Sequence, residues 1–301
     1  MLQNTRLGLG TIIRITLDHP ESQAAREALE LAFATMARVE ELMSAYRPDS
    51  EVGVLNGMGC CDRVSVDTLE VIGRALVYTK LTHGAFDVTV QPVLQNHEKS
   101  PQSDRSGGNV ALGLVGSKDI VIDGRLVCFK KQGMSINLGG IAKGYAVDRA
   151  VRSLRENGVT SAVVDAGGDI RVLGRRSDGK PWRIGVADPA SSRRVTSIIC
   201  LTNMAVATSG TFRRRTRDVI DARTGREADS ILRATVVAPE AADADALATS
   251  VYILGPDEGI RLINSLDGVG ALVLTREGDY ISSERWAGMT SSEEELCYSG
   301  V

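Results

Sequence analysis

The sequence lacks several features that mark familiar kinds of site. It has five cysteines but no C-x-x-C pair, and only three histidines, which argues against a zinc site. The net charge is -3 and the pI is about 5.8, so no nucleic-acid partner is expected. No run of apolar residues approaches the length of a membrane-spanning helix, so no membrane span is expected.

The cysteines and the N-terminal segment also suggest where the protein works. An odd number of cysteines with one adjacent pair, Cys60 and Cys61, is typical of reduced thiols in a cytosolic protein. Residues 1–20 do not resemble a signal peptide, because Arg14 interrupts their apolar part and no cleavage site follows. We therefore expect a cytoplasmic location.

Aromatic residues are scarce, at 4%, whereas glycine is frequent, with 31 residues. This combination indicates many tight turns and close approaches of the backbone. Predicted strands and helices do not alternate regularly, which favours an α+β fold. A chain of 301 residues is long enough for one large domain or for two smaller ones that share a cleft.

Hydrophobic periodicity and turn residues place the elements. A long helix is predicted around Leu29 to Met43, and a second helix is predicted to be capped by Asp67 and closed by Gly84. A third runs to about Gly158, and a fourth has Asp243 as its N-cap. Residues 95–117 are predicted to form an exposed loop. Strands are predicted at about 8–17, 119–130 (a hairpin turning at Asp123-Gly124), 161–173, 182–187, 197–202, 233–238 and 271–283.

The segment "INLGGIAKGYAVDRAV" (136–151) places Gly139, Gly140 and Gly144 around Lys143 at the start of a helix. Glycine costs roughly 1 kcal/mol relative to alanine inside a helix, so three glycines need a reason. Either a bulky ligand approaches the backbone here or another helix packs closely. Backbone N–H groups at a helix start attract phosphate, and Lys143 would add a positive charge. The P-loop spacing is absent.

The segment "AADADALATSVYILG" (241–255) places Asp245 and Thr249 one helical turn apart on the same face. Two oxygen ligands at this spacing, together with a backbone carbonyl and substrate phosphates, suit Mg²⁺. An ordinary capped helix would explain the same residues.

Two further segments contain glycines or hydroxyls in positions that suit ligand contact. Gly167-Gly168 interrupts a predicted strand, which marks a bulge or a close approach of a ligand. Thr208-Ser209-Gly210 can surround the polar edge of a ligand, and residues 221–225 resemble a turn.

In their order and wording these segments resemble the ApbE family of flavin transferases (FAD:protein FMN transferase) over about residues 9–283. The segment "LGGIAKGYAVD" (138–148) is the most distinctive match. The other matching segments are "MSAYRPDSEVGVLN" (43–56), "GAFDVTVQPVL" (84–94), "AGGDIRVLG", "ATSG", "IDARTG" and "ADALATSVYILG".

The resemblance implies an α+β, T-fold-like domain over residues 1–301, with FAD in a cleft between two lobes. It implies Mg²⁺ held by the carbonyl of Ala142 and the side chains of Asp245 and Thr249. The adenosine side of FAD would meet Tyr46, Asn56 and Asp87. The full set of FAD-binding residues implied is Tyr46, Asn56, Phe86, Asp87, Gly139, Gly140, Lys143, Gly167, Gly168, Thr208, Ser209 and Gly210.

The reaction implied by the resemblance is transfer of FMN from FAD to a threonine of a target flavoprotein, with release of AMP. Lys143 and Asp218 would be the catalytic residues. The family usually reads H-x-x-D-P-x-T-G, whereas this chain reads "DVIDARTG", with Asp218 in place of the histidine and Ala222 in place of the proline. Asn137 also stands where an aspartate is common. Two alternatives therefore stay open: hydrolysis of FAD to FMN and AMP, and FAD binding without catalysis.

Overall fold

The structure is a computed structural model and describes residues 1–18, 22–99, 110–188, 191–210 and 219–290. At its centre is an eight-stranded sheet whose neighbouring strands are all antiparallel, in the order β1-β2-β6-β7-β10-β13-β14-β15. These strands are β1 (Leu2–Gly8), β2 (Thr11–Leu17), β6 (Ala162–Ala166), β7 (Asp169–Leu173), β10 (Ala205–Gly210), β13 (Ile231–Ala238), β14 (Gly270–Thr275) and β15 (Tyr280–Ser282).

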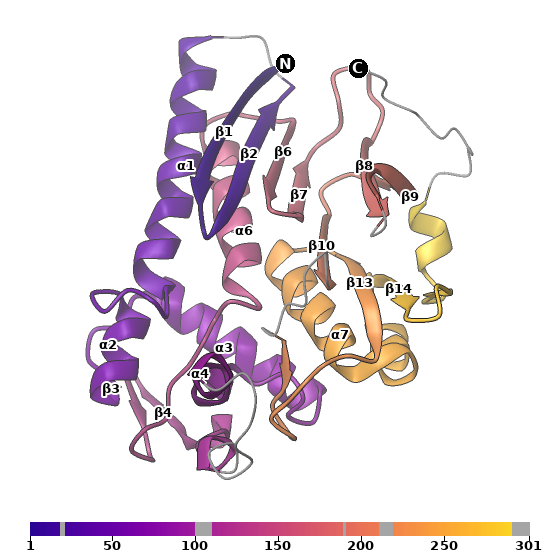
Figure 1. The fold of residues 1–301 in the computed structure, drawn as a ribbon. Coiled ribbons are helices and arrows are strands. Elements are labelled where there is room, and N and C mark those ends of the chain that lie inside the picture. Colours follow the sequence, from indigo (N-terminus) through magenta and orange to yellow (C-terminus); the bar gives the residue numbers. More distant parts are fainter. Residues whose placement is uncertain (19–21, 100–109, 189–190, 211–218, 291–301) are drawn as a thin grey trace.

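Three long helices pack on one face of this sheet and on one another: α1 (Gln23–Met43), α6 (Ala142–Glu156) and α7 (Ala241–Asn264). Figure 1 shows α1 and α6 beside the β1–β2 hairpin and α7 beside β13. Strand alternation directs Ala205 and Ala207 of β10 into this main core. Val206 points the other way, into a second core with Trp182 and Ile199. The α+β prediction is confirmed.

The remaining described elements surround this centre. Smaller sheets pair β3 (Cys60–Cys61), β5 (Leu126–Phe129) and β4 (Ile120–Asp123); β8 (Trp182–Asp188) and β9 (Ser191–Leu201); and β11 (Ile220–Asp221) and β12 (Arg226–Glu227). The shorter helices are α2 (Glu51–Met58), α3 (Val66–Leu81), η1 (Val88–Val90), α4 (Gln91–Lys99), η2 (Ser117–Asp119) and η3 (Trp286–Met289). Among the helices that the structure describes, none is long and apolar enough to cross a bilayer.

Two predicted helix caps are wrong. Helix α3 has Ser65 as its N-cap, whose hydroxyl accepts a hydrogen bond from the Thr68 N–H at 3.2 Å. Asp67 lies inside the first turn, where it accepts a hydrogen bond from the Tyr145 hydroxyl. Helix α7 begins at Ala241, so Asp243 also lies inside the first turn. In both cases the acidic residue suits the positive end of the helix, although another residue is the N-cap.

Two other element predictions need correction. The strand predicted at about 8–17 is the second half of a hairpin, in which Leu9 and Gly10 turn with φ of 54° and 70°. The loop predicted for 95–117 begins too early, because α4 continues to Lys99. The hairpin predicted at 119–130 is confirmed as β4 and β5.

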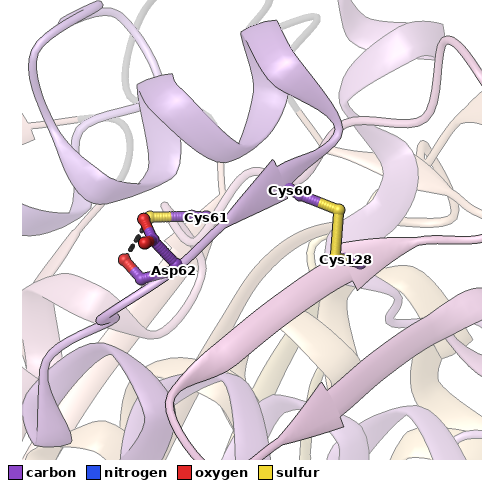
Figure 2. Close-up of a disulfide and its surroundings, with 4 residues drawn as sticks. All are labelled: Cys60, Cys61, Asp62 and Cys128. Atoms are coloured by element: carbon purple, nitrogen blue, oxygen red, sulfur yellow. Dashed lines mark hydrogen bonds between the residues drawn. A yellow bond between two sulfur atoms is a disulfide. The ribbon is translucent and has the colours of Figure 1, made fainter.

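The prediction of reduced thiols is wrong for two cysteines. Cys60 of β3 and Cys128 of β5 face each other across the small sheet and form a disulfide. Figure 2 shows Cys61 pointing away from this bond, toward Asp62, as successive residues of a strand do. Cys61 and Cys200 are free. Cysteine spacing alone could not reveal this pair, because the two residues are 68 positions apart and meet only through strand pairing.

We expect reduction of this disulfide to lower the free energy of unfolding by about 2–4 kcal/mol, because the bond closes a long loop of the unfolded chain. Denaturant titration with and without reductant measures this change, and thiol titration of the unfolded protein should find two fewer thiols before reduction. The Cys200→Ser variant should respond to reductant as the wild type does. A Cys60→Ser/Cys128→Ser variant as stable as the oxidised wild type would contradict this expectation.

Candidate active site

The first turns of helices α6 and α7 pack directly on each other. A Cβ atom at Gly144 of α6 would lie 2.1 Å from the carbonyl oxygen of Ala241, the first residue of α7. Real Cβ atoms do not approach backbone so closely, so only glycine fits here. Of the two explanations that the sequence offered, helix packing therefore accounts for Gly144.

Asp148, also on α6, acts as the cap of α7. Its carboxylate accepts hydrogen bonds from the backbone N–H groups of Ala241 at 2.8 Å and Ala242 at 2.9 Å. The N-cap residue of α7, Glu240, makes no such bond with its side chain. Burial raises the pKa of Asp148, while the positive charge of Arg171 and the two N–H groups act in the opposite direction. Asp148 thus fixes the start of α7 against α6.

This packing brings three charged side chains together. Lys143 of α6 donates a hydrogen bond to Asp169, the first residue of β7, and its Nζ lies 3.6 Å from Oδ1 of Asp245 on α7. The other oxygen of Asp245, Oδ2, accepts a hydrogen bond from the Gly144 N–H at 3.1 Å. Both carboxylates are buried, with side chains only 4% exposed, whereas the lysine is partly exposed. One ammonium group therefore forms ion pairs with two buried carboxylates.

The charges of this group shift its proton affinities. Burial, followed by the negative charge of Asp169, raises the pKa of Asp245 to about 7, although Lys143 and the Gly144 N–H lower it. Burial alone would lower the pKa of Lys143, but the charges of Asp169 and Asp245 outweigh burial and raise it above its ordinary value. The lysine therefore stays protonated. The negative charge of Asp245 is only partly neutralised by its neighbours.

A cleft of about 340 Å³ opens over this group. Its volume lies within the range of small-molecule sites. Helices α4, α6 and α7, strand β10 and the loops around 46, 86 and 219 all contribute to its walls. The residues that line it are Tyr46, Phe86, Asp87, Val88, Val90, Leu94, Glu98, Asn137, Gly139, Gly140, Lys143, Ser209, Val219, Ile220, Asp245, Thr249 and Ile253.

Gly139 and Gly140 form part of the cleft wall just before α6. A Cβ atom at Gly140 would lie 3.2 Å from the Phe86 ring and 3.4 Å from Thr249. The N–H of Gly139 donates to Oδ1 of Asn137 at 2.7 Å, and the Asn137 amide donates to Gln91 at 2.8 Å. At this position an aspartate would also accept from Gly139, but it could not donate to Gln91.

Asp87 stands at the cleft with its carboxylate already engaged. Oδ1 accepts from the N–H of Thr89 at 2.9 Å and from its hydroxyl at 2.7 Å. Oδ2 accepts from the Ser117 N–H at 3.0 Å. Unlike the buried Asp87, Tyr46 is 75% exposed and lies at the rim of the cleft.

The structure does not bring every predicted FAD-binding residue to the cleft. The side-chain amide of Asn56 binds the backbone of Ile136. Its oxygen accepts a hydrogen bond from the Ile136 N–H at 2.7 Å, and its nitrogen donates one to the Ile136 carbonyl at 2.9 Å. Gly167 and Gly168 form the turn between β6 and β7, both with positive φ. Thr208 shares a hydrogen bond with Thr235, and Gly210 packs against Leu232. Asp218 lies outside the described residues.

The oxygen atoms at the cleft fit a hard cation such as Mg²⁺. Asp245 and Thr249 both line the cleft, and Ala142, the first residue of α6, directly precedes Lys143, which also lines it. The hydroxyls of Thr249 and Ser209 share a hydrogen bond of 3.1 Å, which orients the threonine. No group of three or more His, Cys, Asp or Glu residues suited to a metal occurs in the described part of the chain. A site with one carboxylate matches Mg²⁺ that is bound partly by substrate phosphates.

Sequence reasoning overlooked two residues of this region, Asp148 and Asp169. Both stand within the matching segments, Asp148 after the apolar pair Ala146-Val147 and Asp169 before Ile170. That pattern was a usable signal, because buried carboxylates need partners. The partners themselves, the start of α7 and Lys143, come from distant segments and could not be read from spacing.

Comparisons with known proteins support this description. Residues 9–273 match the ApbE family. The structure of the ApbE protein from Thermotoga maritima superposes with a TM-score of 0.88 at 29% identity, covering 96% of this chain and 99% of that one. The flavin transferase ApbE from Vibrio cholerae gives 0.86 at 27% identity, over 96% and 98%. The fold is therefore the α+β fold of the ApbE flavin transferases.

Curated relatives agree at the level of sequence. A protein from Haemophilus influenzae named FAD:protein FMN transferase is 29% identical over 91% of this chain and 85% of the relative. Another of that name, from Vibrio cholerae, is 30% identical over 81% of this chain and 78% of its own. This chain belongs to the ApbE family.

The Gly144→Ala variant tests whether close packing of α6 on α7 builds the site. Its Cβ would meet the Ala241 backbone, so we expect a loss of about 1–3 kcal/mol in the free energy of unfolding. The matched control is Gly73→Ala on α3, where a Cβ meets nothing within 4 Å and the change should be neutral or stabilising. Denaturant unfolding of both variants measures this difference, and equal stabilities would contradict the packing described here.

Proposed function

We propose that this protein is an Mg²⁺-dependent FAD:protein FMN transferase, which attaches FMN to a threonine of a target flavoprotein and releases AMP. The observation that carries the proposal is the convergence of Lys143, Asp245 and Thr249 at a glycine-lined cleft in a chain of the ApbE family. Relatives that match most of the chain's length are named FAD:protein FMN transferase, which supports the proposal.

The cleft offers each part of the substrate a suitable surface. The start of α6 places the positive end of the helix dipole beside Gly139 and Gly140, where a pyrophosphate would lie, while the N–H groups of Gly139 and Gly144 donate to Asn137 and Asp245. Lys143 adds a fixed positive charge, because its pKa is raised. Phe86 and the apolar side chains of α4 and α7 supply surface for a ring system.

In this reaction the threonine hydroxyl oxygen bonds to the phosphorus of the FMN half, and the bond from that phosphorus to the AMP oxygen breaks. The hydroxyl proton must pass to a base. Mg²⁺, when held by Ala142, Asp245 and Thr249, would neutralise charge on the pyrophosphate. Lys143 stabilises the same developing negative charge. The base remains a prediction from the sequence, Asp218, which lies outside the described residues.

Two other outcomes use the same cleft. Water in place of threonine would make the protein an FAD pyrophosphatase that yields FMN and AMP. The replacement of the family histidine by Asp218 is the observation that favours FAD binding without catalysis, because a carboxylate near its reference pKa of about 3.9 is a weaker base than imidazole near 6.5.

Incubation of the protein with FAD and Mg²⁺, with and without a flavoprotein domain that carries an acceptor threonine, separates these outcomes. The proposal predicts AMP release and a fluorescent flavin band on the acceptor in a denaturing gel. AMP and free FMN, equally with and without acceptor, would indicate the pyrophosphatase. Unchanged FAD that nevertheless binds would indicate a silent binder. The last two results both contradict the transferase.

Substitution of the cation ligands tests the metal part of the proposal. We expect Asp245→Ala to reduce AMP release to background and Thr249→Ala to weaken it less, because Mg²⁺ affinity depends mainly on carboxylate charge. The matched control is Asp243→Ala on the same helix turn, whose carboxylate contacts Tyr78 and Arg74 rather than the cleft. Initial rates measured across a range of Mg²⁺ concentrations give the comparison. Full activity of Asp245→Ala at limiting Mg²⁺ would place the metal elsewhere.

A further inference from the structure

We propose that Asp169 is a positioning residue that draws the Lys143 ammonium group toward itself, so that this group makes only a longer ion pair with Asp245 and that carboxylate can still bind the cation. This inference rests on the proposed function, since it concerns the same site. It extends that function by giving a role to a buried carboxylate outside the three expected metal ligands.

The geometry around Lys143 carries the inference. Its ammonium group makes its shorter contact with Asp169 and a second, longer ion pair with Oδ1 of Asp245 at 3.6 Å. Lysine has a long, flexible stem, so a small rotation would bring the ammonium group into full contact with Asp245. A bound ammonium there would compete with Mg²⁺ for the same oxygen. Asp169 therefore limits how closely the ammonium group approaches Asp245.

The backbone holds Asp169 firmly in this position. It follows the Gly167-Gly168 turn, and the Gly168 N–H donates to Asp165 at 2.9 Å across that turn. A Cβ at Gly167 would lie 2.3 Å from the Thr11 hydroxyl, so the turn packs tightly against β2. The two glycines that were predicted to meet FAD thus shape the turn that places Asp169.

Charge accounting supports the same role. Lys143, Asp169 and Asp245 together carry a net charge of about -1 when all are ionised. This excess negative charge favours a divalent cation. Without Asp169 the remaining pair would be neutral, and the lysine would have Asp245 as its nearest carboxylate.

The test measures binding of Mn²⁺, as a spectroscopic substitute for Mg²⁺, by electron paramagnetic resonance of the protein without nucleotide, so that a contact of Lys143 with a pyrophosphate does not affect the result. We expect Asp169→Asn to weaken Mn²⁺ binding by about 10–100-fold, as loss of a residue that orients a ligand does. The matched control is Asp165→Asn, in the same turn, which reaches Gly168 and not Lys143. It should leave Mn²⁺ affinity unchanged.

A rescue experiment separates positioning from other roles. In the double variant Asp169→Asn/Lys143→Gln the competing ammonium is gone, so Mn²⁺ affinity should return to near that of the wild type. Affinity that stays low in the double variant would overturn the proposal, because it would mean that Asp169 binds the metal itself or serves only folding. Unchanged affinity in Asp169→Asn would also overturn it.

Two further results guard against ambiguity. If Asp169→Asn does not fold, the single variant Lys143→Gln decides: the proposal predicts Mn²⁺ affinity at least equal to that of the wild type, and a loss would overturn it. If the wild type binds no Mn²⁺ without nucleotide, this inference fails, whereas Mg²⁺-dependent AMP release would still support the proposed function. If the wild type binds Mn²⁺ and Asp169→Asn binds it with equal affinity, only this inference is refuted and the proposed function stands.

Discussion

The close packing of α6 on α7 is the constraint on which the site depends. Gly144 lets the two helix starts touch, and Asp148 supplies the hydrogen bonds that the first turn of α7 would otherwise lack. These contacts set the distance between Lys143 on one helix and Asp245 on the other. A residue with a side chain at Gly144 would separate the helices and, with them, the charged groups of the cleft.

The electrostatic character of the site follows from that packing. Burial puts Asp169 and Asp245 in a medium where negative charge is costly without partners. Burial, followed by the negative charge of Asp169, raises the pKa of Asp245, and one lysine offsets only part of that rise. A divalent cation and the phosphates of a substrate would complete the balance. The arrangement therefore suits a substrate that brings its own negative charge together with a metal ion.

Much of the fold follows from local sequence signals, and the rest depends on distant contacts. Periodic apolar residues located α1, and Asp123-Gly124 marked the β4–β5 hairpin, because these patterns reflect one element at a time. The N-cap of α3 was misplaced, since Ser65 and Asp67 both suit a helix start and only the backbone distinguishes them. The Cys60–Cys128 disulfide depends on strand pairing.

The candidate site shows the same division. Motif order pointed to Gly139, Gly140, Lys143, Asp245 and Thr249, and the structure places all five at one cleft. Asn56, Gly167 and Gly168 belong to other matching segments, yet they do not line the cleft and serve backbone geometry instead. A motif records which residues occur together, but it does not say whether a residue touches the ligand or supports one that does. That distinction required the hydrogen bonds.

The central claim is that a cation at Asp245 and the pyrophosphate of FAD meet in this cleft. Phosphorus NMR of protein-bound FAD during addition of Mn²⁺ tests it most directly, because a paramagnetic ion broadens only the resonances of nearby nuclei. The account predicts strong broadening of both phosphorus signals in the wild type and little in Asp245→Ala at the same Mn²⁺ concentration. Equal broadening in the two proteins would contradict it.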